Sequence, residues 1–486
     1  MVITANTPKF DKRQPSKGAY DAIVYIDGSQ IIAEDSNGRK IASGVAGTDD
    51  ATVIQTTIDL CGEDCTIYLN GHFVVALNRT GQPWGCIRIT ENYVRLIGIN
   101  GATIDNQSTF DQYTILIEGS VDEHVMGCAI SNIKFLHGND DNGFAAGAIW
   151  LLYANQCYIH NITSVGGTLT SNGCWAVCCV YSHNNVIENI VSIDMRRDAI
   201  LSYLSVGNTI NNINVIGGYA GIRIGHESEV IDFTSDNIIS NVIIQNVERH
   251  GLTLYGTHGN KVQNMSISNA GYSGVYIEGG CENQINNLHV DNAGDLSNIW
   301  QFGIQVQGTS SDNTISNFMV KNSHRAGIWL YEADRTIIFG GCVKNNNTED
   351  VSGYSGIAIQ ESDGVIISNV SAMDDQTSPT QVYGIRVYAT ATKYKIQSCQ
   401  FSGNKVSPIL LASKDGKING CDPTENSGSS TGTGSEQTIA HGLVSAPTKA
   451  YIYIPSTGEM VGVASDATNI YPNVPAAVAY NWHAEV

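Results

Sequence analysis

Short runs of alternating apolar and polar residues dominate the chain from about residue 125 to residue 425, and Gly and Asn separate them. Such alternation is typical of β-strands that bury one face, and the Gly and Asn positions between them indicate turns. No stretch in this region has the 3.6-residue periodicity of a helix. The pattern therefore predicts a long succession of short strands and tight turns.

One motif, apolar-x-Asn-apolar, recurs through this region. The gaps between successive asparagines are 29, 28, 23, 29, 23, 23, 30 and 52 residues, and the last gap divides into 23 and 29 if Gly340 fills a missing position. A period of 22–30 residues without a helix fits a coil of three short strands, in which each turn stacks on the next at a spacing of ~4.8 Å. The asparagines are Asn132, Asn161, Asn189, Asn212, Asn241, Asn264, Asn287, Asn317 and Asn369.

A second motif, Gly-Ile-x-Ile or a close variant, follows the asparagines in the same register. Two independent columns in register predict a parallel β-helix. The other repeat folds do not fit, because a leucine-rich repeat needs Leu at fixed positions and a propeller needs a unit of ~40 residues. Asn tolerates the left-handed backbone of a sharp corner, and stacked amides can hydrogen-bond from turn to turn. The motif begins at Gly221, Gly251, Gly274, Gly303, Gly327, Gly356 and Gly384.

The N-terminal part of the chain is predicted to cap the coil, whose open strand edges need a cover. The segment 48–62 has an N-cap signal in Thr48-Asp49-Asp50, an apolar face formed by Val53, Ile54, Thr57 and Ile58, and a C-cap signal at Gly62. Before it, alternating residues flank the Asp27-Gly28 turn, which predicts a β-hairpin.

We therefore divide the chain into four parts. Residues 1–47 form a leader and hairpin, and residues 48–426 form the β-helix with its capping helix. Residues 427–434, rich in Gly, Ser and Thr, are predicted to be a flexible linker, and residues 435–486 to be a small C-terminal β-module.

The charge balance narrows the possible partners. The chain has 486 residues, 46 acidic and 26 basic, for a net charge of −20, but only 15% of its residues are charged and 42% are apolar. This composition predicts a folded chain with an ample core and argues against nucleic-acid binding, because the acidic surface repels phosphate. No run of 18 apolar residues is present, so we expect no membrane insertion, and the first residues lack the apolar core of a signal peptide.

The sequence gives little support for a metal or a cofactor. None of the 12 cysteines lies in a CxxC-to-His arrangement with zinc spacing, and we expect most of them to be buried free thiols. The acids on the predicted outer columns form no cluster of the kind that holds Ca²⁺, so a calcium site stays possible but unsupported.

In each Gly-Ile-x-Ile strand the apolar residues point inward, and the positions at −2, +2 and +4 from the Gly point outward. These columns are rich in aromatic residues, Arg and Gln, which suit an extended glycan because aromatic rings stack on sugar C–H faces and Arg and Gln hydrogen-bond in a plane. A subunit interface or an ordinary solvated sheet would have a similar composition. The candidate substrate-binding residues are Arg197, Tyr219, Arg223, His226, Tyr272, Gln305, Gln307, Arg325, Trp329, Tyr331, Arg386 and Tyr388.

The candidate catalytic residues are Arg249, His250, Tyr255, Tyr276 and Glu278. A lyase or C5-epimerase needs a base for the α-proton of a uronate and a cation for its carboxylate, which these residue types provide. A glycosidase needs two carboxylates flanking the scissile bond. Glu278 is the only acid in the three columns, while Glu227, Glu248, Glu332 and Asp334 lie in adjoining turns, so hydrolysis remains an alternative.

The segment GTDDATVIQTTIDLCGEDCTIYLNGHFVV, followed by the two motif columns, resembles the pectate-lyase-like right-handed β-helix superfamily. It is similar in particular to the helix-capped versions found in viral tailspikes and in archaeal or viral β-helix proteins. The resemblance covers residues 20–425, and it implies an all-β, right-handed parallel β-helix. Alginate epimerases and lyases of this fold similarly use Tyr, His and Arg on one sheet face. Their Tyr-Gly-x-Asp-Pro-His string has no clean copy here, so none of their residues is carried over. The C-terminal segment resembles the small β-modules of tail-fibre proteins.

These observations together predict a polysaccharide-binding β-helix that modifies its ligand as a lyase, C5-epimerase or hydrolase. The alternative is a non-catalytic adhesin or structural fibre, in which the same face serves as a receptor-binding or homotrimer surface. We expect an extended polysaccharide as partner and an extracellular or virion-associated location.

Overall fold

The protein is described by a computed structural model. It describes residues 20–76, 85–108, 113–137, 146–166, 174–226, 234–294, 301–350, 353–413, 415–422, 425–440, 447, 449–466 and 469–485. The chain divides into two compact units. Unit 1 comprises Met1–Gly271 and Val275–Ile285, and unit 2 comprises Tyr272–Gly274 and Asn286–Val486.

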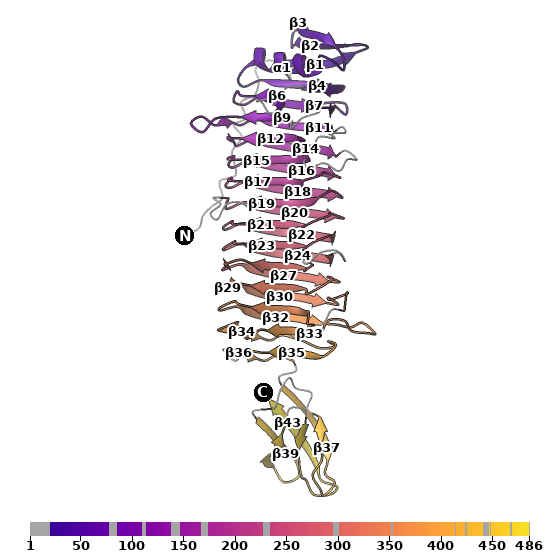
Figure 1. Cartoon of the computed structure of the whole chain (residues 1–486), viewed down its shortest axis with the longest axis vertical. Helices are drawn as coiled ribbons and strands as arrows, with labels where there is room; N and C mark the ends of the chain where they lie inside the picture. Colours follow the sequence, from indigo (N-terminus) through magenta and orange to yellow (C-terminus); the bar gives the residue numbers. More distant parts are fainter. Residues whose placement is uncertain are drawn as a thin grey trace. The chain divides into compact units, whose positions relative to one another are not determined.

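Unit 1 is built from two stacks of parallel strands, which Figure 1 shows as successive rungs. The strands that carry the Asn motif lie in one stack, sheet A, and those that carry the Gly-Ile-x-Ile motif lie in the other, sheet B. Both stacks begin with strands that lack the motif. In sheet A the coil strands are β4 (Thr66–Asn70), β5 (His72–Val75), β7 (Arg95–Gly98), β8 (Thr103–Asn106), β11 (Ala129–His137), β14 (Tyr158–Val165), β16 (Val186–Ile193), β18 (Thr209–Ile216), β20 (Ile238–Gln245) and β22 (Lys261–Ala270). In sheet B they are β6 (Gly85–Ile89), β9 (Tyr113–Glu118), β12 (Ala146–Leu152), β15 (Cys174–Val180), β17 (Asp198–Tyr203), β19 (Ala220–Gly225), β21 (Leu252–Tyr255) and β23 (Val275–Glu278). A short parallel pair, β10 (Val125–Met126) and β13 (Ala154–Asn155), lies outside these sheets.

The apolar positions of the Gly-Ile-x-Ile motif form the interior of the coil. Ile222 pairs with Leu252, and Leu252 pairs with Val275, so the motif stays in register from rung to rung. All three side chains are almost completely buried. The glycine has a steric reason: a Cβ at Gly221 would lie 2.1 Å from the carbonyl oxygen of Gly251 on the next rung. The predicted register and inward face are therefore confirmed.

The Asn column forms the left-handed corner predicted from the sequence. All nine motif asparagines have φ between 50° and 60°, and Gly340, the predicted substitute, has φ of 63°. In unit 1 the amide nitrogen of Asn161 donates to Asn132 Oδ1 at 2.9 Å, and that of Asn264 donates to Asn241 Oδ1 at 3.0 Å. The corner bends each long sheet A strand in its middle, which gives a turn of the coil three straight segments.

A second Asn ladder, which we did not predict, runs inside the coil where the chain passes from sheet B back to sheet A. The backbone N–H of Asn185 donates to Asn208 Oδ1 at 2.8 Å, and that of Asn208 donates to Asn237 Oδ1 at 3.0 Å. The ladder continues through Asn260 and Asn283 in the same way. All five side chains are fully buried. These amides satisfy backbone groups that the turns leave unpaired in the interior.

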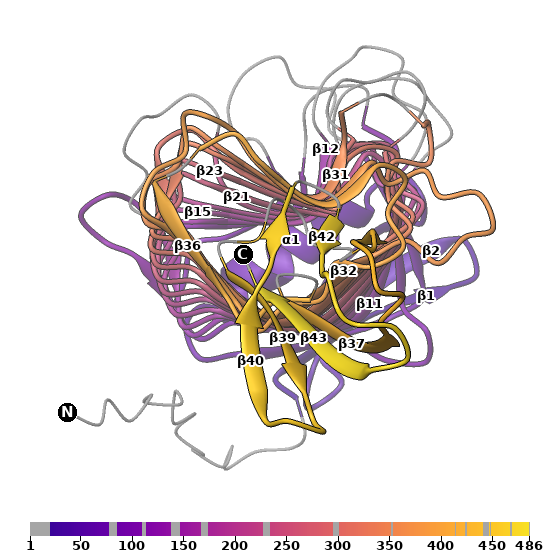
Figure 2. The same ribbon diagram turned by 90° about the horizontal axis from the view of Figure 1, so that it is seen from below.

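Helix α1 (Asp50–Cys61) covers the N-terminal end of the coil, across its interior (Figures 1 and 2). Gln55 of α1 takes the place of a missing rung: its amide nitrogen donates to Arg88 O at 2.9 Å, and its Oε1 accepts from Arg88 N at 2.7 Å. The buried carboxylate of Asp50 likewise accepts from Val74 N at 2.7 Å. The helix thus satisfies strand edges that would otherwise be open.

The predicted apolar face and the C-cap of α1 are confirmed, because Val53, Ile54, Thr57 and Ile58 are buried and Gly62 has φ of 70°. The side-chain N-cap is wrong in detail. The N-cap residue Asp49 makes no cap hydrogen bond to the helix, and its carboxylate instead accepts from the N–H of Val45, which ties the preceding turn to the helix.

The predicted hairpin is present and has one further strand. β1 (Ala22–Asp27) pairs with β2 (Gln30–Asp35) around the Asp27-Gly28 turn, and β2 pairs antiparallel with β3 (Lys40–Val45). β1 also pairs in parallel with β4, so the hairpin is continuous with sheet A.

Unit 2 repeats the same two kinds of parallel strand. Its strands in sheet B are β25 (Ile304–Gln307), β28 (Ile328–Tyr331), β31 (Ser355–Gln360), β33 (Tyr383–Val387) and β35 (Ser407–Leu411). In β35, Pro408 takes the place of the motif glycine. Its other coil strands are β27 (Thr314–Lys321), β30 (Ile337–Lys344), β32 (Ile366–Met373), β34 (Tyr394–Gln397), β36 (Gly416–Asn419) and the short pair β26 (Ser310–Ser311) and β29 (Ala333–Asp334). β24 (Gln284–Ala293) spans the point at which the chain passes from unit 1 to unit 2.

The C-terminal residues form antiparallel strands around a separate core that includes Ile452, Tyr480 and Trp482. The flexible linker predicted at 427–434 is wrong for Ser427 to Thr431, which pair with β43 as part of β37. Small residues accept an extended conformation when a neighbouring strand supplies the hydrogen bonds, and here β43 does. The strands are β37 (Glu425–Thr431), β38 (Ile439–Ala440), β39 (Lys449–Ile454), β40 (Glu459–Gly462), β41 (Ala464–Ser465), β42 (Asn469–Tyr471) and β43 (Ala479–Glu485).

Two further findings concern the described residues. No helix there is both long and apolar enough to cross a membrane. The cysteines whose side chains are described carry free thiols, and most of these are buried.

Candidate functional site

The candidate site lies on the outer face of sheet B in unit 1. Because side chains alternate along a strand, the residues between the inward aliphatic positions point away from the coil. Arg223 pairs with Thr253, and Thr253 pairs with Tyr276, so these three outward positions lie in one column. Tyr255 pairs with Glu278 in the neighbouring column. The outward columns predicted from the sequence are therefore present across β19, β21 and β23.

Four of the five predicted catalytic residues meet around Tyr276. The imidazole of His250 stacks on the Tyr276 ring, with centroids 4.6 Å apart and planes 14° apart. The Tyr255 ring lies 6.5 Å from the Tyr276 ring, at a tilt of 48°. The Tyr276 hydroxyl donates a hydrogen bond to Oε2 of Glu278. The arrangement places an imidazole, two phenols and a carboxylate together on one face.

Arg249, the fifth predicted catalytic residue, packs to one side of this cluster. Its guanidinium lies over the ring of Tyr219, 5.0 Å from the centroid, in a cation–π contact. Both side chains are half-buried. Arg249 therefore offers a fixed positive charge beside the cluster.

Arg223 adds a second positive charge, and a residue that we did not predict holds it. Nε of Arg223 donates to Oδ1 of Asp198 at 3.0 Å, and only 3% of the Asp198 side chain is exposed. An ion pair in such surroundings fixes the orientation of the guanidinium. The segment Met195–Asp198 contains two Arg and ends in Asp198 at the start of β17, which is the sequence signal for charged contacts here. The segment alone does not identify Arg223 as the partner of Asp198.

An aromatic cluster continues the outer face toward the N-terminus and was also missed. The Tyr113 ring lies 4.7 Å from the Trp150 ring and 6.0 Å from the Trp175 ring, and Arg197 lies over Trp175 at 5.4 Å. Leu201 is part of the same cluster. The strands of these aromatic residues lack the Gly-Ile-x-Ile motif, so a search for that motif does not identify the aromatic cluster.

His226 belongs to the edge of the outer face, where its ring lies 5.1 Å from that of Tyr203 at a tilt of 49°. Glu227, considered as an acid in an adjoining turn, lies outside the described residues.

The predicted binding residues of unit 2 form a separate set on its own strands. The Trp329 ring stacks on Phe302 at 4.6 Å and on Tyr331 at 5.5 Å. A hydrogen bond with Glu361 raises the pKa of Tyr331.

Two Arg–Tyr contacts complete the set in unit 2. Arg325 lies over Tyr354 at 5.1 Å, and Arg386 lies over Tyr388 at 4.1 Å. Burial raises the pKa of Tyr388. Tyr272 is half-buried.

The expectation that Gln305 is an accessible binding residue is wrong. Its side chain has no exposed surface, because its Oε1 accepts from Ser273 at 2.9 Å and its amide nitrogen donates to Gln307 at 2.7 Å. Gln307 is itself only 9% exposed. Alternation along a strand predicts the side to which a residue points, but it does not predict what covers that residue.

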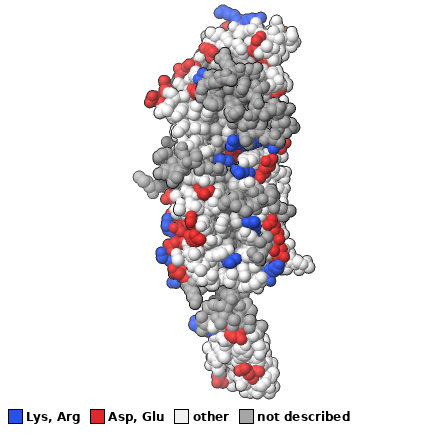
Figure 3. All heavy atoms as spheres, in the orientation of Figure 1, with Lys and Arg blue, Asp and Glu red and all other residues white. Residues whose placement is uncertain are grey.

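The electrostatic character of the outer face differs from that of the whole chain. The chain has a net charge of −20, yet three Arg residues lie in or beside successive strands of sheet B. Arg197 directly precedes β17, Arg223 lies in β19, and Arg249 lies in the turn before β21. Figure 3 shows one side of the molecule, on which Lys and Arg gather next to Asp and Glu near the level of β19 and β20. Among the described residues, no group of three or more His, Cys, Asp or Glu side chains lies close enough together to hold a metal ion.

Comparisons with known proteins agree with the architecture. A family model described as right handed beta helix region matches residues 230–338 and 302–442. No curated protein sequence matches the chain.

Several solved structures resemble the chain at low sequence identity. A double mutant of the tailspike protein of E. coli bacteriophage HK620 superposes with a TM-score of 0.55 at 10% identity, covering 93% of this chain and 92% of that one. The same tailspike in complex with a pentasaccharide gives 0.52 at 10% identity with the same coverage. The A-module of the mannuronan C-5 epimerase AlgE4 of Azotobacter vinelandii gives 0.49 at 16% identity, covering 77% of this chain and 96% of that one. At these identities the tailspike likeness establishes the fold: the chain is a right-handed parallel β-helix protein. The two motif columns predict the parallel β-helix, and the family resemblance implies its right hand.

Proposed function

We propose that the chain binds an extended polysaccharide along the outer face of sheet B in unit 1 and modifies it at the cluster around Tyr276. The observation that carries this proposal is that His250, Tyr255, Tyr276 and Glu278 converge, with Arg223 and Arg249 beside them, on β19, β21 and β23 and in the turn before β21. The pentasaccharide complex of the HK620 tailspike supports a saccharide as the ligand class of such a coil. It also supports an extracellular or virion-associated location.

The binding part of the proposal follows from the spacing and chemistry of the face. Adjacent strands lie ~4.8 Å apart, so an extended chain that runs along the coil meets a new set of side chains at every rung. The half-buried Tyr255 offers a ring face to sugar C–H groups, whereas Tyr276 is only 9% exposed beneath His250 and can present its hydroxyl group alone. The guanidinium groups offer planar donors to carboxylates or hydroxyls. A polyanionic chain is favoured over a neutral one, because Arg197 and Arg249 present guanidinium groups on this face of an otherwise acidic protein, whereas Asp198 balances the charge of Arg223.

The chemical part of the proposal is proton abstraction at C5 of a uronate. Arg249 or Arg223 would neutralise the sugar carboxylate and stabilise the charge that develops when the C5–H bond breaks. His250 or Tyr255 would take the C5 proton as general base. In a lyase the C4–O bond then breaks, and the leaving oxygen receives a proton from Tyr276, which Glu278 positions. In an epimerase a proton returns to C5 from the opposite face.

Hydrolysis is the less favoured reaction. A glycosidase needs a pair of carboxylates free to act on the glycosidic bond and on water. Asp198 is engaged with Arg223, and Glu278 accepts the Tyr276 hydroxyl. These engagements favour the uronate chemistry over hydrolysis.

The test is a panel of bacterial and algal polysaccharides, with product analysis by mass spectrometry and ultraviolet absorbance. A lyase product absorbs because it contains an unsaturated uronate, an epimerase changes the sugar ratio without chain cleavage, and a hydrolase cleaves without absorbance. Arg249→Ala and Glu278→Gln should each abolish turnover. Arg335→Ala, which removes an exposed ion pair with Asp312, serves as the matched control.

Two results would decide against the proposal. If binding and turnover survive both substitutions, the site does not lie on the outer face of sheet B. Binding that depends on Arg249, without any product from any polysaccharide, would make the chain a non-catalytic adhesin or fibre.

A further inference from the structure

A third column of left-handed residues follows the sheet A strands of unit 1, at the corner that leads to sheet B. Asp194, Gly217, Asn246 and Asn269 have φ between 50° and 67°. The backbone N–H of Asp194 donates to Ile216 O at 2.9 Å, and that of Gly217 donates to Gln245 O at 2.8 Å. These four residues therefore occupy successive rungs.

The side chains of this column form an amide ladder that Gly217 interrupts. Nδ2 of Asn269 donates to Oδ1 of Asn246 at 2.8 Å, so each amide reaches toward the preceding rung. The rung before Asn246 holds Gly217, which has no side chain to receive the next amide. A Cβ at Gly217 would lie 2.0 Å from Oδ1 of Asp194, so the Asp194 carboxylate leans over the vacant rung.

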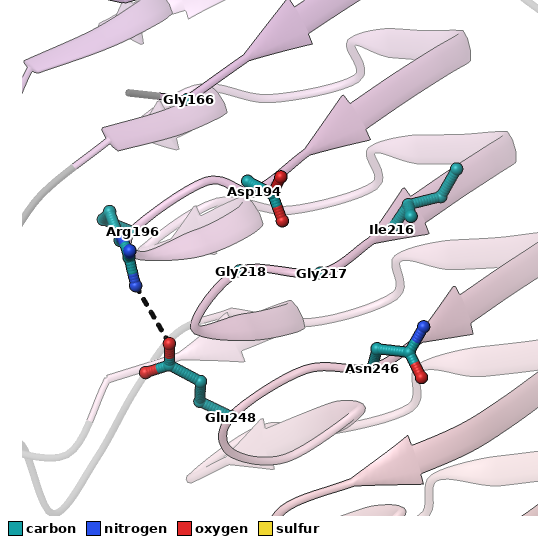
Figure 4. A pocket seen from close by; sticks show the side chains of 8 residues that line it. All are labelled: Gly166, Asp194, Arg196, Ile216, Gly217, Gly218, Asn246 and Glu248. Carbon is teal, nitrogen blue, oxygen red and sulfur yellow. Dashed lines mark hydrogen bonds and ion pairs between the residues drawn. The ribbon is translucent and has the colours of Figure 1, made fainter. Parts of the chain in front are cut away.

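A pocket of about 520 Å³ occupies this place, and every residue that lines it is described (Figure 4). Its lining includes Asp194, Arg196, Gly217, Gly218, Asn246 and Glu248. Gly218 can carry no side chain, because a Cβ there would lie 2.3 Å from Met195 O and the residue has φ of 88°.

The two ends of the pocket offer complementary hydrogen-bonding groups. Figure 4 shows the amide nitrogen of Asn246 on the side of Gly217 and the Asp194 carboxylate above that glycine. Within the described part of the chain, neither the Asn246 Nδ2 nor the Asp194 carboxylate has a hydrogen-bond partner. The pocket thus has two N–H donors at one end and a carboxylate acceptor at the other, two rungs away.

An ion pair forms the wall of the pocket. Arg196 Nη1 lies 2.9 Å from Glu248 Oε1. Arg196, Gly218 and Glu248 directly precede Arg197, Tyr219 and Arg249, which begin the outer face of sheet B. The pocket therefore opens at the border of the surface on which we place the polysaccharide.

We propose that this pocket is a side subsite for one pyranose unit, a branch sugar of the polysaccharide; the inference rests on the proposed function. A sugar ring carries hydroxyl groups that both donate and accept, so one ring can receive the Asn246 amide and donate to Asp194. The volume lies in the range of small-ligand pockets. A divalent cation fits less well, because Arg196 neutralises Glu248 and Asn269 occupies the Asn246 oxygen.

Gly217→Asn is the decisive variant. Asn adopts positive φ readily, and its side chain would restore the ladder and fill the vacant rung. We expect the affinity for a branched polysaccharide to fall at least tenfold, whereas the affinity for the debranched chain stays within twofold of wild type. Asp194→Asn, which keeps the side-chain size, should weaken only branched-chain binding, by about threefold to tenfold.

The matched control is Gly340→Asn. Gly340 has φ of 63° and stands in the other Asn column, where a Cβ would lie 3.2 Å from Asn317 Oδ1. This substitution fills a ladder position without filling the pocket. It should leave affinity for both polysaccharide forms unchanged, and circular dichroism with thermal melting checks that both variants fold.

The probes are bacterial polysaccharides in matched pairs, with their branch sugars and after removal of these sugars by mild acid. If the wild-type protein binds branched chains no better than Gly217→Asn does, the pocket is not a sugar subsite, but the proposed function stands. If the wild-type protein binds none of the polysaccharides in the panel, the proposed function itself is wrong. A Gly217-dependent affinity for CaCl₂, measured by calorimetry without any sugar, would replace the sugar subsite with a cation site.

Discussion

Asp198 of β17 forms a buried ion pair with Arg223 of the neighbouring β19: the distance from Arg223 Nε to Asp198 Oδ1 is 3.0 Å, and the two side chains are 11% and 3% exposed. Removing one member of a buried ion pair leaves the other charge without compensation. We expect Asp198→Ala to lower the free energy of unfolding by ~3 kcal/mol. Urea denaturation followed by circular dichroism measures this change.

The double variant Asp198→Leu with Arg223→Met separates stability from function. Because apolar residues of similar size replace both charges, its stability should return to within ~1 kcal/mol of wild type. Its affinity for a polyuronate should remain reduced, because the cation is gone. Full recovery of binding in this variant would show that Arg223 has a purely structural role.

The hydroxyl of Tyr276 can be tested without disturbing its ring. Tyr276→Phe keeps the stack with His250 but removes the hydrogen bond to Glu278. If Tyr276 donates the proton to the leaving oxygen, kcat should fall by about 10²-fold or more while KM changes little. Product formation under saturating polysaccharide provides the measurement.

Tyr219→Phe is the matched control for this substitution. It removes a tyrosine hydroxyl from the same face and keeps the ring beneath Arg249. Its kcat should stay within about threefold of wild type. Equal losses in the two variants would mean that the face binds saccharide through hydroxyl groups in general and that Tyr276 has no special role.

The coil could be predicted because its constraints fall on single residue types at a fixed period. A corner at positive φ selects Asn, and the close approach of Gly221 to Gly251 O selects glycine, so both columns are visible in one sequence. The interior Asn ladder follows an equally regular pattern, an Asn two residues before an inward Ile or Val, as at Asn208 and Asn260. This pattern is present in the sequence, but it is shorter than the two motifs and lies in the turns between strands.

The candidate site could be predicted only in part. Strand periodicity identified the column that holds Tyr276 and the register of Glu278, because these depend on the motif alone. The partner of Arg223 and the burial of Gln305 depend on neighbours from other rungs, which the motif does not specify. The pocket beside Asp194 exists because one ladder position lacks a side chain, and this becomes visible only when the rungs are stacked.

The two Asn ladders should differ in their contribution to stability. Asn208 is fully buried; its Oδ1 accepts from Asn185 N at 2.8 Å, and its Nδ2 donates to Ser182 O at 3.0 Å. Asn208→Ala leaves both backbone groups unsatisfied in the interior, which should lower the free energy of unfolding by ~2–4 kcal/mol. Urea denaturation of the variant measures the loss.

The control is Asn212→Gly in the exposed ladder. Asn212 donates to Asn189 Oδ1 at 2.6 Å and has φ of 54°, which glycine adopts without strain. Water replaces the lost hydrogen bond, so we expect a change below ~1 kcal/mol. A larger loss at Asn212 than at Asn208 would contradict the role assigned to the interior ladder.

His137 makes the stability of the fold depend on pH. It is 6% exposed, its Nε2 lies 3.0 Å from Ser164 Oγ, and burial lowers its pKa to about 4 from the ordinary value of 6.5. Because the folded-state pKa is the lower one, the unfolded chain binds the proton first as pH falls below 6.5. Stability is therefore lost between pH 6.5 and pH 4, by ~2 kcal/mol on going from pH 7 to pH 5. His137→Gln does not titrate and retains a polar partner for Ser164. Urea denaturation at pH 7 and pH 5 measures the loss of unfolding free energy in both proteins. The loss should be ~2 kcal/mol smaller in the variant, because all other titrating groups are common to both proteins. Equal losses would mean that His137 is protonated in the folded state.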